Sequence, residues 1–257
     1  MRRKRRRIRQ GKRINRWQHG LVVVVGVVAV LFIAFFVLTN VVFAVKNVEY
    51  SGSFSVDPNE ITRASGIRFG RSIFGVDEST VRDRVNALGV VALEDVVIHY
   101  PSTVTLCVRD RTDQAMLVYS GGVAILDEEG CVIRSSTEVP NEDLLYVTGF
   151  HVFQCRTGAP IDAQMGQRNA FTAVMQALIV NGAKPYVSEL DLEDVNNLFL
   201  LTRGGITVRL GGMENMYNKI AWMKGAVADL EARGEYGGAL DVQSGTKADY
   251  IPPSPLD

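Results

Sequence analysis

Residues that build metal sites and disulfide frameworks are scarce in this sequence. Its 257 residues include three histidines and three cysteines, and Cys107, Cys131 and Cys155 belong to no Cys-x-x-Cys pair. Structural zinc sites are commonly built from such pairs, and disulfide frameworks are built from an even number of cysteines. We therefore expect no metal and no cofactor, with Cys107 and Cys131 acting as small buried apolar residues in predicted strands. The spacing leaves open whether any two of them form a disulfide.

Acidic residues are missing from the first 48 positions. Ten of the 28 basic residues lie within the first sixteen, so the rest of the chain carries 18 basic against 28 acidic residues. This asymmetry argues against a nucleic-acid-binding globule, because affinity for polyanions is confined to a short tail. We expect residues 1–20 to form a basic cytoplasmic tail.

Polar side chains are also absent from Leu21 to Leu38, and the apolar run resumes after Asn40 and continues to Val45. Residues 21–45 are long enough to form a transmembrane helix. A cleavable signal peptide is the alternative, but its apolar region is shorter and ends at a small-residue cleavage site, which this stretch matches poorly. The basic tail predicts a single-pass type II protein of the cell membrane, with residues 46–257 extracytoplasmic.

The first half after this helix predicts a strand, two helices and a β-hairpin. Asp57 and Pro58 begin the first helix as cap and first residue, Glu60 occupies the capping-box position, and Gly66 ends it. The other expected elements are a strand at 46–51, a helix with Val81, Val85 and Leu88 on one face that ends at Gly89, and hairpin strands Val96–Tyr100 and Thr103–Asp110.

The second half predicts strands and two amphipathic helices. The expected strands are Val123–Leu126, Cys131–Ile133, Leu144–Thr148, Val187–Leu192, Leu198–Leu201, Ile206–Leu210, Ala239–Gln243 and Lys247–Ile251, and the helices are Gln167–Val180 and a segment through Met216 and Leu230. We predict an α+β fold with a domain at 46–112, a mixed α/β domain with an extended antiparallel sheet at 113–251, and a disordered tail at 252–257.

Three patterns suggest chemistry without completing it. Thr103–Cys107 is similar to a sortase nucleophile segment, but His99 is only eight positions away, and a thiol nucleophile needs a suitably placed base. Gly66–Ser72 has the wrong spacing for a phosphate loop and favours a connection between helices. The acidic groups at 127–129 and 191–194 favour solvated turns. We expect no catalytic residues.

The order of these elements, together with five local motifs, resembles the bacterial division proteins FtsQ and DivIB. The domain at 46–112 is similar to their POTRA domain. Asp110 stands where the family has glutamate, and the stretch from Val139 to Gln167 matches poorly. The motifs are Val45–Gly52, Tyr100–Arg111, Ala124–Ile133, Gly204–Gly211 followed by Lys219, and Leu240–Val242 with Tyr250.

This resemblance implies a non-enzymatic divisome scaffold at the septum. It would bind coiled-coil membrane proteins of the FtsB/DivIC and FtsL types and help control septal peptidoglycan synthases indirectly. The alternatives are another anchored POTRA-containing assembly protein, for secretion or sporulation, and, least of all, a sortase-like transpeptidase.

We expect the last strands to form a sheet edge that accepts a partner's strand. The competing interpretation is that these residues only complete the core. The expected partner-binding residues are Leu240, Asp241, Val242, Gln243, Ala248, Tyr250 and Ile251.

Overall fold

The structure is a computed structural model that describes residues 16–139 and 143–253. Most of the expected basic tail and the expected tail after Pro253 lie outside these residues. Helix α1 (Arg16–Val37) continues into one π-helical segment (Leu38–Val42). Together they contain one stretch, Gly20–Val42, that is long and apolar enough to cross a membrane. At 1.5 Å per residue its 23 residues reach roughly 35 Å.

The two polar residues in this stretch are satisfied within the helix. The Thr39 hydroxyl donates to Phe35 O at 2.9 Å, and the Asn40 amide donates to Phe36 O at 2.9 Å. Such bonds to the preceding turn spare polar side chains an unpaired position in hydrocarbon. The helix ends at Val42, three residues before the expected Val45, because Ala44 and Val45 are buried in the folded part that follows.

The first folded module has the predicted order of elements. It comprises β1 (Asn47–Ser51), α2 (Pro58–Ser65), a 3-10 turn (Ile73–Gly75), α3 (Glu78–Asn86), β2 (Val91–His99) and β3 (Thr103–Asp110), with sheet order β1-β3-β2. Asp57 caps α2 by accepting from Asn59 N at 2.8 Å, and Gly66 ends it with φ of 70°. Leu88 lies beyond α3, and β2 begins five residues before the expected Val96.

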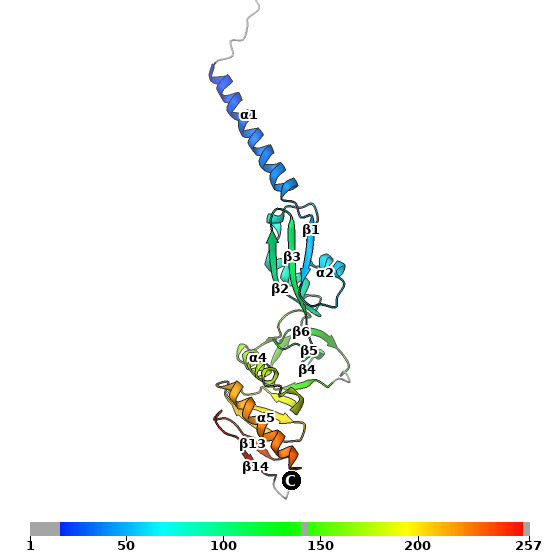
Figure 1. Ribbon diagram of the computed structural model, residues 1–257, viewed down its shortest axis with the longest axis vertical. Helices are drawn as coiled ribbons and strands as arrows, with labels where there is room; N and C mark the ends of the chain where they lie inside the picture. The colour runs from blue at the N-terminus through cyan, green and yellow to red at the C-terminus, as the bar shows by residue number, and fades with distance from the viewer. Residues whose placement is uncertain (1–15, 140–142, 254–257) are drawn as a thin grey trace, which may run out of the picture. The chain divides into compact units, whose positions relative to one another are not determined.

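The remaining chain contains a nine-stranded sheet, of which strands β4, β5, β6, β13 and β14 are labelled in Figure 1. Its order is β14-β13-β12-β11-β10-β7-β4-β5-β6. The expected antiparallel sheet is mixed, since β7 pairs in parallel with β4 and β10, and β12 with β13. The strands are β4 (Ala115–Tyr119), β5 (Gly122–Leu126), β6 (Val132–Ser136), β7 (Leu145–Thr148), β10 (Val187–Asp191), β11 (Leu198–Thr202), β12 (Thr207–Gly211), β13 (Ala239–Asp241) and β14 (Asp249–Ile251).

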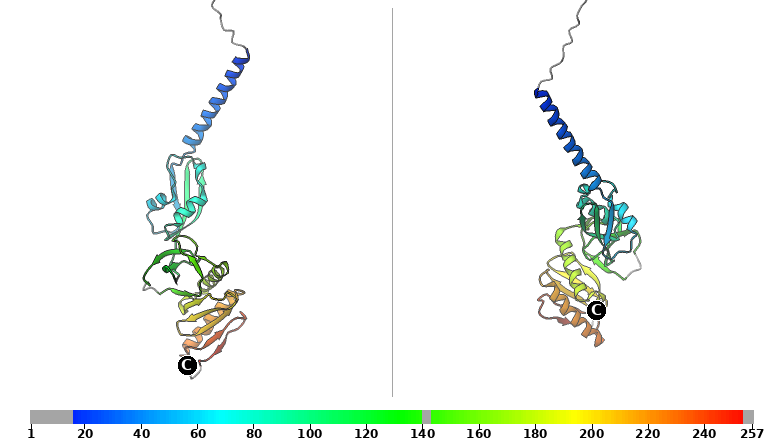
Figure 2. Two further views of the ribbon diagram at one scale, coloured as in Figure 1. Left: turned by 180° about the vertical axis from the view of Figure 1, so that it is seen from behind. Right: turned by 45° about the horizontal axis from the view of Figure 1, so that its top comes forward.

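Two long helices, α4 (Met165–Val180) and α5 (Met216–Ala232), cover one face of this sheet, and the view from behind has the strands in front of them (Figure 2). A two-stranded ribbon, β8 (Val152–Gln154) with β9 (Asp162–Ala163), and a 3-10 turn (Lys184–Tyr186) complete the elements. The helix residues predicted to face inward are buried, among them Phe171, Met175, Ile220 and Met223. They meet inward-facing strand residues such as Leu240 in one apolar core.

Residue contacts divide the described residues into two compact units. One contains 16–49, 68–76 and 98–105, and the other contains 50–67, 77–97 and the described residues from 106 onward. The second unit thus joins part of the 46–112 region to the nine-stranded sheet. Ion pairs from Arg109 and Arg111 to the turn after β5 supply part of that connection.

Candidate functional site

The nine-stranded sheet ends at β14, the last strand in chain order. β14 pairs antiparallel with β13 through Ala239↔Ile251, Leu240↔Tyr250 and Asp241↔Asp249, and it has no strand on its other side within the described residues. β13 is an inner strand, because β12 pairs with it in parallel on the opposite side. The expected edge is therefore β14 alone. Leu240 and Asp241 lie one strand inward in β13, and Val242 and Gln243 follow that strand.

The hydrogen-bonding direction of each β14 backbone group follows from the pairing of β13 with β12. Gly238 O accepts from Thr207 N at 3.0 Å, and Val242 N donates to Arg209 O at 3.1 Å, so even-numbered residues of β13 bond toward β12. Ala239 and Asp241 therefore bond toward β14, where they meet Ile251 and Asp249. Tyr250 lies between these two pairs, so its N–H and C=O point away from the sheet.

The side chains around this edge divide into core and surface. Leu240 and Val242 are fully buried, which agrees with the interpretation that they complete the core. Tyr250 and Ala248 are half-buried against the same core, and the Tyr250 hydroxyl donates to Gly237 O at 3.2 Å. Ile251 is 54% exposed. The surface of the edge therefore consists of the Tyr250 backbone and the side chains of Asp249 and Ile251.

Asp241 and Gln243 have local roles in the turn after β13. The Asp241 carboxylate accepts from Gln243 N at 3.0 Å and from the Gln243 side-chain amide at 3.2 Å. These bonds hold the turn that returns the chain to β14. Gln243 N is thus already bonded, and it is not an outward-pointing donor of the edge strand.

A glycine fixes how closely β14 approaches the start of β13. Gly238 has φ of +80°, and a Cβ built there would lie 2.4 Å from Ile251 O. Only glycine combines this backbone conformation with so close a contact. Pro252 follows the strand directly and has no N–H, which ends the outward row of donors.

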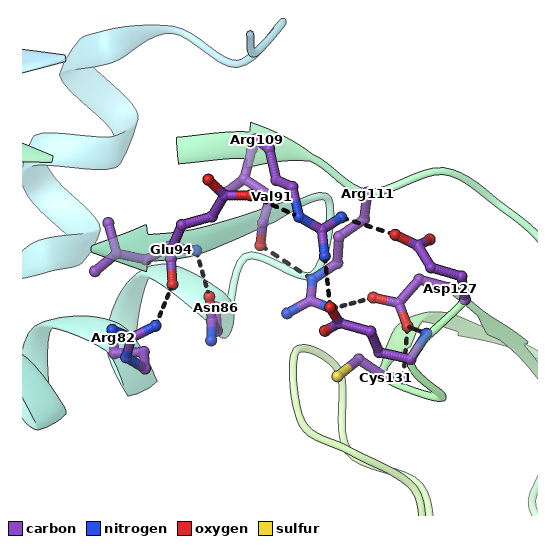
Figure 3. A network of polar contacts seen from close by, with 11 residues as sticks. Arg82, Asn86, Val91, Glu94, Arg109, Arg111, Asp127 and Cys131 are labelled. Carbon is purple, nitrogen blue, oxygen red and sulfur yellow. Dashed lines mark hydrogen bonds and ion pairs between the residues drawn. The ribbon is translucent and has the colours of Figure 1, made fainter. Parts of the chain in front are cut away.

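A second polar cluster connects β3 to the turn after β5 (Figure 3). Arg111 forms an ion pair with Asp127, whose side chain is fully buried, and donates through Nε to Val91 O at 3.2 Å. Asp127 also accepts from Glu129 N at 2.9 Å and Cys131 N at 2.8 Å. We call these residues, together with Arg109, the junction network.

Asp127 was expected in a solvated turn, and the structure corrects this. Burial opposes the charge of Arg111, but its neighbours Cys131 and Asp127 outweigh that cost and raise the pKa of the guanidinium. Arg109 is more exposed and forms ion pairs at 3.0 Å with Glu94, Glu128 and Glu129. Each carboxylate of the acidic run at 127–129 therefore forms an ion pair with one of two arginines.

The same turn contains a set of atoms with metal-ligand spacing. Side-chain ligand atoms of Asp127, Glu129 and Cys131 lie within 4.8 Å of one another. Arg111 already pairs with Asp127, and burial, with a further contribution from Asp127, raises the pKa of the Cys131 thiol. Metal ions prefer a deprotonated thiolate and an unpaired carboxylate. The protonated Cys131 thiol and the Arg111–Asp127 ion pair therefore favour a structural ion pair over a metal site. All three cysteines are free thiols in the structure.

The other sequence patterns that suggested chemistry belong to turns, a connection and a strand. The acidic group at 191–194 forms a turn in which Asp191 and Asp194 accept from the backbone N–H two residues on, at 2.9 Å each. Gly66–Ser72 connects α2 to the following 3-10 turn, as predicted. Cys107 is half-buried in β3.

The described residues thus combine one span-length apolar helix, a β-α-α-β-β module and a helix-covered sheet whose last strand, β14, lies at one edge. This is the architecture of a membrane-anchored protein with a POTRA module. The family model for the FtsQ-type POTRA domain matches residues 43–111. The FtsQ cell division protein of Corynebacterium glutamicum is 30% identical over 215 residues, which cover 79% of this chain and 88% of that protein. The chain belongs to the FtsQ/DivIB family of cell division proteins.

Other relatives match shorter or more divergent stretches. FtsQ of Caulobacter vibrioides is 32% identical over 107 residues, or 42% of this chain and 35% of that protein. DivIB of Clostridium botulinum is 18% identical over 179 residues, or 69% of this chain and 70% of that protein. The solved extracytoplasmic domain of Geobacillus stearothermophilus DivIB covers 47% of this chain at 13% identity, with a TM-score of 0.30. The family assignment rests on the sequence matches.

Proposed function

We propose that this protein is a non-enzymatic scaffold of the division machinery that binds a partner along β14. The partner would be a membrane-anchored coiled-coil division protein of the FtsB/DivIC type, with an FtsL-type protein in the same complex. Through them the scaffold would help control the septal peptidoglycan synthases. Membership in the FtsQ/DivIB family supports the role in division.

The observation that carries the proposal is the outward backbone of Tyr250 on an uncovered edge strand. An added strand gains main-chain hydrogen bonds from such an edge and selectivity from the side chains beside it. Ile251 supplies an exposed apolar side chain next to these groups.

The edge can be tested with variants at one position. Tyr250→Pro removes the outward N–H together with the ring, whereas Tyr250→Ala removes the ring and keeps the N–H. The measurement is the affinity of the full-length protein in nanodiscs for the FtsB/DivIC-type protein of the same organism. We expect Tyr250→Pro to bind at least about 10-fold more weakly than Tyr250→Ala, the equivalent of roughly 1.4 kcal/mol.

Two controls make this comparison decisive. Tyr250→Phe removes only the hydroxyl that bonds Gly237 O and should bind like the parent. The melting temperature of each variant shows whether the sheet is intact. Equal affinities for Tyr250→Pro and Tyr250→Ala, in variants that melt alike, would remove the main-chain edge from the proposal.

A further inference from the structure

Three chain segments meet immediately after the membrane-span helix, all within one compact unit. They are Phe43–Lys46, which leaves the helix, the loop 68–76 and the turn 98–105. Ile73 N donates to Phe43 O at 2.8 Å, Val45 N to Arg71 O at 2.8 Å, and Lys46 N to Ser102 O at 2.8 Å. The loop and the turn are thus bonded to the first four residues beyond the span.

This arrangement fixes the distance of the two loops from the hydrocarbon. Four extended residues reach at most about 14 Å, and Ile73 is bonded to the first residue after Val42. The polar headgroup layer on each side of a bilayer is about 5–8 Å thick. The tip of the loop 68–76 therefore lies at the level of the headgroups whenever Gly20–Val42 spans the bilayer.

The side chains on these segments are aromatic and exposed. Phe69 is 59% exposed, Phe74 57% and Tyr100 61%. The Phe74 and Tyr100 rings pack on Phe43, with centroid distances of 5.2 Å from Phe43 to Phe74 and 6.2 Å from Phe43 to Tyr100. Three large exposed rings around one end of a folded module are costly in water, and aromatic residues are enriched where protein meets the membrane interface.

The formally charged side chains of the three segments are all basic. Lys46, Arg68 and Arg71 are exposed, and segments 43–46, 68–76 and 98–105 contain no aspartate or glutamate. This contrasts with the acid excess of the chain beyond its first sixteen residues. Within the described residues, none of these three cations has a carboxylate at ion-pair distance. Anionic headgroups attract such basic residues at a membrane surface.

We propose that Lys46, Arg68, Phe69, Arg71, Phe74 and Tyr100, the juxtamembrane surface, lie on the lipid bilayer and bind anionic headgroups. The rings enter the interface of the leaflet that faces the folded part, and the cations contact lipid phosphates. The occupant is lipid because the span helix leads directly into this surface, which leaves little height for another protein. Contact at the loop and the turn as well as at the helix would restrict the tilt of the first module relative to the membrane.

The test uses the full chain in vesicles and one tryptophan as a depth probe. Replacing the two native tryptophans, Trp17 and Trp222, by phenylalanine leaves a silent background into which Phe74→Trp is introduced. Tyr236→Trp is the matched control, because Tyr236 is 60% exposed but belongs to the other compact unit. In phosphatidylcholine and phosphatidylglycerol vesicles with bromine near the headgroup, we expect Phe74→Trp to lose emission and the control to lose none.

The charge requirement is tested in the same vesicles. Arg68→Gln and Arg71→Gln are each combined with Phe74→Trp. When phosphatidylglycerol is present, each lost charge should lower about 5-fold the ratio of anchored chains whose juxtamembrane surface contacts lipid to anchored chains whose surface does not. Without anionic lipid the two substitutions should have little effect. A tryptophan at position 74 that bromine does not quench overturns the proposal. Blue-shifted but unquenched emission also overturns it, since a second copy or another protein would then cover the surface.

Discussion

Arg109 lies on β3 and Arg111 directly follows that strand, yet their guanidinium groups have different surroundings. The Arg111 side chain is 3% exposed and its partner Asp127 is fully buried, whereas Arg109 is 28% exposed and contacts three carboxylates that reach solvent. Removing one member of a buried pair leaves an uncompensated charge, while exposed pairs contribute little. The two arginines therefore form a matched comparison.

We expect Arg111→Met to lower the free energy of unfolding by about 3–5 kcal/mol, and Arg109→Met by less than about 1 kcal/mol. Adding Asp127→Asn to Arg111→Met should restore part of the loss, because the amide oxygen still accepts from Glu129 N and Cys131 N. Urea denaturation of the full chain measures these differences. Equal losses for the two arginines would show that the junction network does not stabilise the fold through its buried pair.

Cys131 offers a local control for the same experiment. Burial raises the pKa of its thiol, so alkylation at neutral pH should be slow in the parent protein. Arg111 itself lowers that pKa, so its removal raises the pKa further and disfavours the reactive thiolate. Faster alkylation of Cys131 in Arg111→Met would therefore report opening of the junction and not a change in thiol acidity.

At the scale of elements, the position of β14 depends on Gly238. Gly238 and Gly234 have similar positive φ values of +80° and +72°, but a Cβ on Gly234 would meet no atom within 4 Å. Gly238→Ala should therefore displace β14 by its contact with Ile251 O, whereas Gly234→Ala carries only the backbone strain, of order 1–3 kcal/mol. Faster hydrogen exchange at Asp249 and Ile251 in Gly238→Ala alone would confirm this. Equal exchange in both variants would contradict it.

Elements whose limits depend on local residues could be predicted from the sequence. Helix α2 was predicted from cap to cap because Asp57, Pro58 and Gly66 act on their own neighbours. Strand β4 was missed, since its run Ala115–Tyr119 has no period-2 alternation and follows the expected domain boundary at 112. On one side β4 pairs with β5 in a local hairpin, and on the other it pairs in parallel with β7, about thirty residues later. The parallel pairing with β7 leaves no local pattern.

In the candidate site, too, local features could be predicted from the sequence and long-range pairings could not. The edge at the end of the chain was predicted, but its assignment to β14 alone depends on the parallel β12–β13 pairing. Asp127 was interpreted as solvated because its neighbours Glu128, Glu129 and Gly130 are typical of a turn. Its partner Arg111 comes from another element, and only the three-dimensional fold brings the two together.

For the whole molecule, the ten basic residues before Leu21 predict which side of the membrane holds the folded part. In spheroplasts, added proteinase K should digest residues 46–257 and leave the basic tail protected inside. The measurement is an immunoblot with tags at each end, and a cytoplasmic protein serves as the control for intact cells. Survival of the distal sheet while a secreted marker is cleaved would reverse the predicted orientation.

The place of β14 in the chain has a consequence for synthesis. β14 follows every other strand of its sheet, so the ribosome releases it after the span helix and after all the residues of the helix-covered core. A nascent chain interrupted before Asp249 would already carry its membrane span and most of its core, but the proposed partner edge would be missing. Complex formation through the proposed edge would therefore select for chains translated through their last strand, and incomplete chains would fail to recruit the partner.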